Sequence, residues 1–155
     1  MTRPILLAAV CLAAACAGGP KSMVGKSEAD LRSSLGAPKA EYANRDGSRT
    51  LAYPTGPLGT ETHMAEVSPS GTVTAVRQAL VEETFNRINV GMTADEVLRM
   101  IGPAGETMNF PRQSEVSWQY LFTDAWGYAA HFFVNLREGE VVSKFTRRIE
   151  RVQRP

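Results

Sequence analysis

The chain repeats one phrase, and this repetition constrains its fold more than any other feature. Each copy has a Gly, a hydroxyl residue two positions later, an acid three positions after that, and then an apolar residue. An apolar-Gly pair close to a proline ends the phrase. The copies occupy residues 24–36 and 90–102. Internal repeats indicate structural units of one type arranged along a chain, so we expect two such units.

Each phrase has the signals of a short helix. The hydroxyl residue and the acid three positions later have the spacing of a capping box; these pairs are Ser27 with Asp30, and Thr93 with Glu96. Apolar residues four apart predict a buried stripe, and a glycine before a proline fits a left-handed C-terminal cap. These residues are Leu31, Leu35, Gly36 and Pro38 in the first copy, and Val97, Ile101, Gly102 and Pro103 in the second.

Strand signals follow each helix. Alternating apolar residues and turn residues predict three antiparallel strands per unit, over 49–53, 61–68 and 72–80, and then over 116–122, 131–136 and 141–149. A further helix is expected over 79–88, before the second phrase. The fold class is therefore α+β, with two tandem repeats that each pack a short helix pair on a three-stranded antiparallel sheet. The phrases align at an offset of 66 residues and the strands at 69, which predicts a three-residue insertion between helix and sheet.

The N-terminus is typical of an export signal. Arg3 precedes an apolar run over 5–15 that is too short to span a bilayer, and small residues surround Cys16. In one interpretation, residues 12–16 resemble a lipobox, so that Cys16 carries lipid and Ala17 after it favours the outer membrane. In the other, an ordinary small-x-small cleavage site releases a soluble periplasmic protein. Cys11 would be lost with the signal, which leaves no disulfide.

These signals divide the chain into five parts: a signal peptide (1–15), a tether (16–23), a first repeat (24–80), a second repeat (81–150) and a basic tail (151–155). The formal net charge is only +1, so there is no overall field for nucleic acid. The C-terminal end is locally basic, and this end is either a solvated strand or a contact for an acidic partner or anionic lipid. Its basic residues are Lys144, Arg147, Arg148, Arg151 and Arg154.

The second phrase and the aromatic strand after it carry a family resemblance. Residues 88–93, then Ile101-Gly102-Pro103 and the alternation of Trp118, Tyr120 and Phe122, resemble the SmpA/OmlA (BamE) family of outer-membrane lipoproteins. That resemblance implies a lipid anchor at Cys16, the periplasmic face of the outer membrane and barrel-assembly proteins as partners. The tandem arrangement more distantly resembles β-lactamase inhibitor proteins, which implies the alternative of an inhibitor-like or sensor module that binds a periplasmic enzyme.

Catalytic chemistry has few candidates in this sequence. His63 and His131 occupy different positions in the two repeats, and each is read as a histidine within a sheet. No metal-ligand spacing, phosphate loop or nucleophile elbow is present. We expect no enzyme activity, no cofactor and no metal site.

Aromatic residues offer a better candidate for function. Trp126 and Tyr128 lie between two predicted strands, where exposed rings are typical binding anchors; alternatively, they fold back over the core. The sequence thus predicts a non-catalytic protein-binding scaffold, with partner contacts at Trp126, Tyr128, Arg147, Arg148 and Arg151 and lipid at Cys16.

Overall fold

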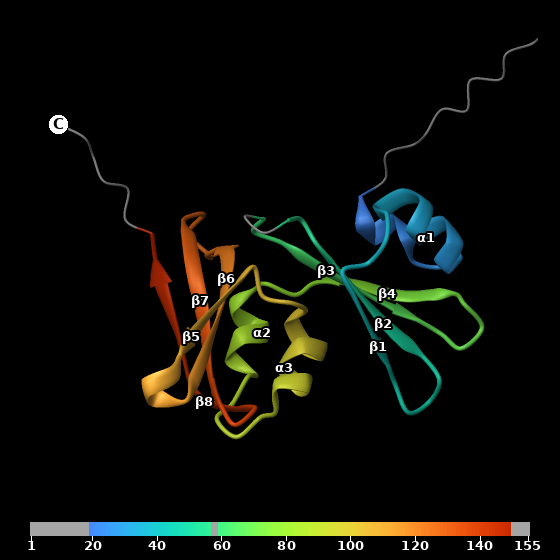
Figure 1. The fold of residues 1–155 in the computed structure, drawn as a ribbon. Coiled ribbons are helices and arrows are strands. Elements are labelled where there is room, and N and C mark those ends of the chain that lie inside the picture. Colours follow the sequence, from blue (N-terminus) through green and yellow to red (C-terminus); the bar gives the residue numbers. More distant parts are fainter. Residues whose placement is uncertain (1–18, 57–58, 150–155) are drawn as a thin grey trace, which may run out of the picture.

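The computed structural model describes residues 19–56 and 59–149. Two four-stranded antiparallel sheets dominate it (Figure 1), each with its strands in chain order. The strands of the first sheet are β1 (Ala40–Ala43), β2 (Arg49–Pro54), β3 (Thr62–Val67) and β4 (Val73–Gln78). Those of the second are β5 (Glu106–Phe110), β6 (Glu115–Thr123), β7 (Ala129–Arg137) and β8 (Glu140–Arg148).

The helices are few and short. They are α1 (Glu28–Leu35), α2 (Glu82–Asn86) and α3 (Ala94–Ile101), with 3-10 turns η1 (Pro20–Met23) and η2 (Pro111–Gln113). Helix α1 covers one face of the first sheet, and α2 and α3 lie between the two sheets (Figure 1). The layers therefore run α1, first sheet, α2 with α3, second sheet.

The predicted fold class is wrong. The structure is mostly β, with two four-stranded sheets and few helices, and does not consist of two helix pairs on three-stranded sheets. The sequence interpretation missed β1 and β5, the first strand of each sheet. Four of the five residues of β5 are exposed, because this edge strand has no neighbour on one side and covers little core. Such a strand has no hydrophobic alternation, so its backbone pairing is what defines it.

Both predicted capping boxes are confirmed. Ser27 Oγ accepts a hydrogen bond from the Asp30 N–H at 3.1 Å, and the Asp30 carboxylate accepts one from the Ser27 N–H at 3.3 Å. In the second box, the hydrogen bond from the N-cap backbone to the carboxylate is shorter, since the Thr93 N–H donates to Glu96 Oε2 at 2.7 Å. The longer Glu side chain reaches the N-cap backbone more closely than Asp does.

The C-terminal caps differ from the predicted left-handed form. Gly36 has φ 81° and ψ −165°, and Gly102 has φ 77° and ψ −172°. The positive φ matches the expectation, but this ψ places both residues in a region that is almost restricted to glycine. In each repeat, the backbone therefore leaves the helix in an extended conformation. It then enters the strand that the sequence interpretation missed, β1 or β5.

Equivalent backbone contacts occur in both repeats and define how the repeats align. The N–H groups of Gly25 and Gly91 donate to Val73 O and Val141 O, and each sheet has a β-bulge, at Glu66/Val67 and at Asn135/Leu136. The offset is 66 residues at the helices and at β1/β5, 67 at β2/β6, 69 at β3/β7 and 68 at β4/β8. The predicted insertion between helix and sheet is therefore wrong, because the length changes lie in the hairpins.

One core joins the two repeats. Val97 and Ile101 of α3 are fully buried, and they belong to one cluster with Ala52 and Met64 of the first sheet and with Tyr120 of the second. The far face of the first sheet packs on α1 through Leu31 in a separate cluster. Because the first sheet is covered on both faces, the four consecutive β2 residues 50–53 are all buried.

Gly102 and Gly36 give a matched test of this joint core. A Cβ added to Gly102 would meet Thr62 Cγ2 at 3.0 Å and Ala52 Cβ at 3.4 Å, whereas one added to Gly36 would meet nothing within 4 Å. Both substitutions impose similar backbone strain of about 1–3 kcal/mol. Gly102→Ala should cost about 1 kcal/mol more than Gly36→Ala, because it alone overpacks the contact between the repeats. Urea unfolding measures this difference, and equal losses of stability would contradict the close approach.

Candidate binding surfaces

The end of the β6–β7 hairpin is organised by a buried carboxylate. Asp124 Oδ1 accepts hydrogen bonds from the backbone N–H groups of Trp126 and Tyr128, each at 2.9 Å. Asp124 Oδ2 pairs with Arg148 of β8, 2.8 Å from Nε and 2.6 Å from Nη2. Gly127 has φ 81°, and its N–H donates to the Asp124 carbonyl at 2.9 Å. The turn is thus held by hydrogen bonds among its own residues and by the ion pair of Asp124 with Arg148 of β8.

The electrostatics of Asp124 follow from these contacts. Burial of the carboxyl tends to raise its pKa, but the hydrogen bonds from the Tyr128 N–H, the Arg148 side chain and the Trp126 N–H outweigh burial and hold the pKa below its ordinary value. Asp124 is therefore ionised at neutral pH, as its ion pair with Arg148 requires.

This rigid turn presents aromatic side chains to solvent. Trp126 is 80% exposed and Tyr128 is 52% exposed. The Arg148 guanidinium lies 4.7 Å from the centre of the Tyr128 ring, within the range of a cation–π contact. The alternative in which both rings fold back over the core does not describe Trp126. We call the group of Asp124, Trp126, Tyr128 and Arg148 the hairpin surface.

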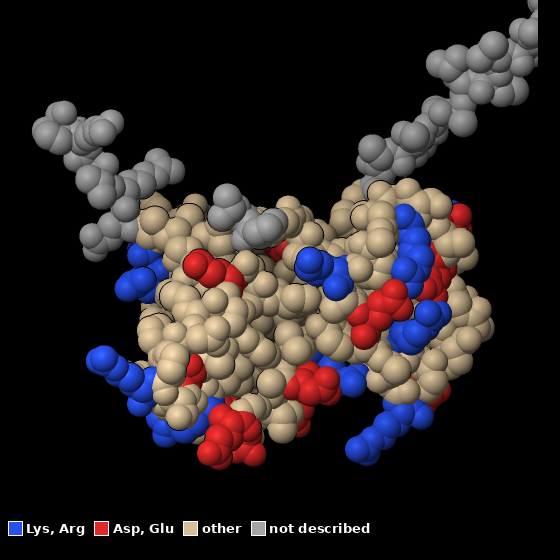
Figure 2. Space-filling view, viewed as in Figure 1, with Lys and Arg blue, Asp and Glu red and all other residues tan. Residues whose placement is uncertain are grey.

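The structure separates the other predicted site residues from this surface. Arg147 precedes Arg148 on β8, so its side chain points to the opposite face of the sheet. There its guanidinium lies 5.4 Å from the Phe133 ring, which stacks on Phe145 with 4.6 Å between ring centres. Cys16 and Arg151 lie outside the described residues, as do the signal peptide, the first three residues of the tether and the tail. Basic and acidic side chains are mixed over the face shown in Figure 2.

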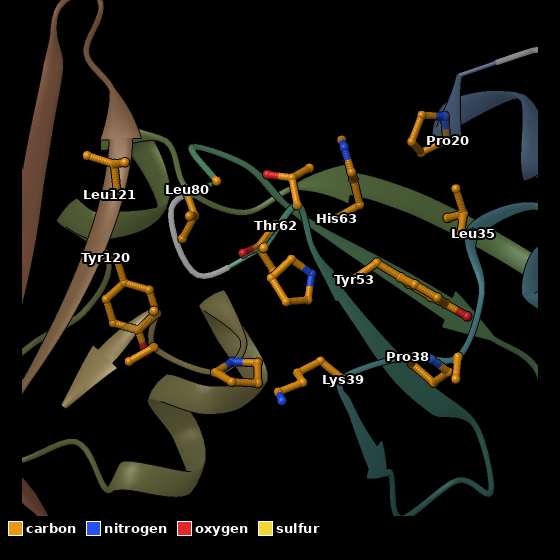
Figure 3. A pocket seen from close by; sticks show the side chains of 18 residues that line it. Pro20, Leu35, Pro38, Lys39, Tyr53, Thr62, His63, Leu80, Tyr120 and Leu121 are labelled. Carbon is orange, nitrogen blue, oxygen red and sulfur yellow. The ribbon is translucent and has the colours of Figure 1, made fainter.

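A cavity of about 710 Å³ lies where the two repeats meet (Figure 3). Its wall on the side of the first repeat includes Pro20, Leu35, Pro38, Lys39, Tyr53 and His63. Pro103, Tyr120 and Leu121 belong to the wall of the second repeat. This cavity was not anticipated from the sequence, because its walls come from segments up to a hundred residues apart.

The polar groups of the cavity are few. Tyr53 is 7% exposed, and its hydroxyl finds no hydrogen-bond partner among the described residues. Burial raises the pKa of this hydroxyl, so it stays protonated as a donor. His63 Nε2 lies 3.1 Å from Oε2 of Glu61, the residue that directly precedes β3. His131 instead lies beside Phe133 on the outer face of the second sheet, 5.9 Å between ring centres, so the two histidines do not form one site.

Within the part of the chain that the structure describes, no three His, Cys, Asp or Glu side chains are grouped so as to hold a metal ion. Between residues 19 and 149, apart from 57–58, no helix is long and apolar enough to cross a membrane.

Comparisons with known proteins identify no family. No protein-family model and no curated protein matches the chain significantly. Among solved structures, a candidate β-lactamase inhibitor protein from Streptococcus mutans matches at 11% identity and a TM-score of 0.31, over 78% of this chain and 82% of that one. Its description agrees with the second, more distant resemblance noted in the sequence. The SmpA/OmlA resemblance finds no support in these comparisons.

Two longer secreted proteins also match. An extracellular SCP-domain protein from Bacillus anthracis matches at 12% identity and a TM-score of 0.37, over 92% of this chain and 49% of that one. A cysteine-rich secretory protein from Staphylococcus aureus matches at 14% identity and a TM-score of 0.33, over 81% of this chain and 44% of that one. At these identities and TM-scores, the likenesses define neither a family nor an activity.

Replacing Asp124 tests how the hairpin surface is held. Asp124→Asn removes the charge that binds Arg148 and should lower the urea midpoint at pH 6. Because the folded pKa of Asp124 lies below the ordinary 3.8, its contribution is complete above that value and is lost as the pH falls through the folded pKa. The gap between wild type and variant should therefore narrow as the pH is lowered from 4 through the range in which Asp124 becomes protonated. A gap that is constant across this range would contradict the assignment.

Proposed function

We propose that this protein is a non-catalytic envelope lipoprotein that binds a protein partner through the hairpin surface. The observation that carries the proposal is a tryptophan that is 80% exposed on a turn whose backbone is fixed by a buried carboxylate. Large aromatic side chains contribute much of the binding energy at protein interfaces. A fixed turn loses little conformational entropy when it binds, so most of the energy of burying the ring remains available.

The chemistry of the hairpin surface suggests the kind of epitope that it meets. Trp126 offers an apolar ring, and Tyr128 offers a ring whose face already contacts Arg148. The guanidinium is half-exposed and is paired with Asp124 on one side. We infer that the partner presents an apolar pocket with an acidic or carbonyl-rich rim, which would receive Trp126 and the free edge of the Arg148 guanidinium.

The proposed location follows from the N-terminus and the family resemblance. Lipid on Cys16 would hold the protein at the periplasmic face of the outer membrane, and the resemblance to SmpA/OmlA makes barrel-assembly proteins the first partners to test. Cleavage without lipidation would instead give a soluble periplasmic protein. An inhibitor-like or sensor module that binds one periplasmic enzyme remains the alternative function.

Affinity capture from envelope extracts tests the hairpin surface. Trp126→Ala should reduce recovery of the partner about tenfold or more, because truncating a central aromatic anchor typically costs at least about 2 kcal/mol. Phe110→Ala is the matched control, since Phe110 is an exposed aromatic at the opposite end of the same sheet. Equal recovery with both variants would rule out the hairpin surface. Barrel-assembly proteins in the eluate favour the first function, and a single soluble enzyme favours the alternative.

Mass spectrometry of the mature protein tests the anchor. We expect an N-terminal Cys16 with acyl groups, and Cys16→Ser should move the protein from the membrane fraction to the soluble fraction. An unmodified N-terminus at Cys16 or Ala17 would show that the protein is not lipidated, whatever the outcome of the capture experiment.

A further inference from the structure

The cavity occupies the place in the first repeat that α2 fills in the second. Phe85 of α2 stacks on Phe132, with 4.0 Å between ring centres, and meets Phe122 edge-on at 4.8 Å. By the register of the strands, the equivalents of Phe132 and Phe122 in the first repeat are His63 and Thr55. Both of these residues line the cavity.

The first repeat has no aromatic side chain to fill this place. At the offset of the helices, Phe85 corresponds to Gly19, and Asn86 at the end of α2 corresponds to Pro20. Pro20 lies on the cavity wall and begins a 3-10 turn at the position where α2 ends in the second repeat. The chain therefore reaches the edge of the cavity and leaves it unfilled by any residue that the structure describes.

The Tyr53 hydroxyl beside the cavity differs from its counterpart in the second repeat. Tyr120 and Tyr53 are equivalent, and the Tyr120 hydroxyl donates to Gly102 O at 3.1 Å. The Tyr53 hydroxyl is also buried but has no hydrogen-bond partner among the described residues, and Figure 3 shows it between Leu35 and Pro38. A buried donor without an acceptor costs about 1–3 kcal/mol. Beside Leu35 and Pro38, the wall of the cavity therefore lacks the hydrogen bond that Tyr120 makes in the second repeat.

Charge further narrows the occupant. Lys39 lies on the wall, and none of the described residues that line the cavity is acidic. Helix α2, the element seated on the equivalent face, carries Glu82 and Glu83 in its first turn. A segment with the character of α2, an aromatic ring with acids one turn before it, is thus complementary to both the apolar wall and Lys39.

We propose that the cavity is a docking site for a short amphipathic helix of a partner protein, which presents an aromatic side chain over His63 and Thr55 and an acid toward Lys39. This is helix-in-groove recognition, with the second repeat as its internal template. The cavity volume is within the range of specific binding pockets. The site goes beyond the hairpin surface and does not depend on it, since it lies on different residues.

The protein itself supplies a probe. A fluorescein-labelled peptide of residues 79–92 contains Phe85 with both acids, and its anisotropy in the presence of the full chain measures binding. We expect saturable binding in the micromolar range, because a free short peptide loses conformational entropy when it becomes ordered on binding. The same peptide with Phe85→Ala should bind at least tenfold more weakly. Equal affinity of the two peptides would overturn the proposal.

A variant that fills the cavity gives the decisive control. The backbone at Gly19 has φ −59°, and an added Cβ would meet nothing within 4 Å, so a side chain fits there. Gly19→Phe should place a ring where Phe85 lies in the second repeat, raise the unfolding temperature and abolish peptide binding. Ser33→Phe adds the same side chain to an exposed position of α1, and it should change neither quantity.

Further results of these binding experiments would overturn the docking proposal or support it. Undiminished peptide binding by Gly19→Phe would place the peptide elsewhere and overturn the proposal. If a fluorescent fatty acid bound the wild type but not Gly19→Phe, and the peptide bound neither, the cavity would be a lipid site and the proposal would be wrong. Because Trp126→Ala leaves the cavity intact, its peptide affinity should equal that of wild type.

Discussion

The packing of α3 between the two sheets is the contact on which the rest of the structure depends. Val97 and Ile101 are fully buried in a cluster that includes residues of both sheets. Gly102 brings the end of the helix so close to the first sheet that no side chain fits without displacing Thr62 or Ala52. Arg99 adds polar contacts, since it donates to Ala43 O at 2.8 Å. One helix thus stabilises two sheets, and the repeats share a core.

This sharing explains why the two repeats diverge. The second repeat must cover its sheet with α2 and α3 on one face only, whereas the first sheet has α1 on one face and α3 on the other. The neighbouring repeat thus covers the second face of the first sheet, a stabilising contact that the outer face of the second sheet lacks. The cavity lies at the place in the first repeat that α2 fills in the second.

Local interactions were the part of this structure that the sequence could predict. The capping box of Thr93 and Glu96 depends on residues three apart, and the prediction was confirmed. Strand β5 was missed because an exposed edge strand is defined by its neighbour and not by its own side chains. At the hairpin surface, Trp126 and Tyr128 were found from their position between strands. The role of Asp124 was not, because it depends on Arg148, 24 residues away in the chain.

Equivalent positions that differ between two copies of one unit separate scaffold from function. Residues that both copies need for folding, such as the capping pairs and the positive-φ glycines at the helix ends, are the same in kind. The copies differ at the β6–β7 hairpin, which is two residues longer than its counterpart, and where Gly19 replaces Phe85. Neither difference is required by the shared core. The first creates an exposed aromatic surface and the second an open cavity, so both binding proposals rest on departures from the internal symmetry.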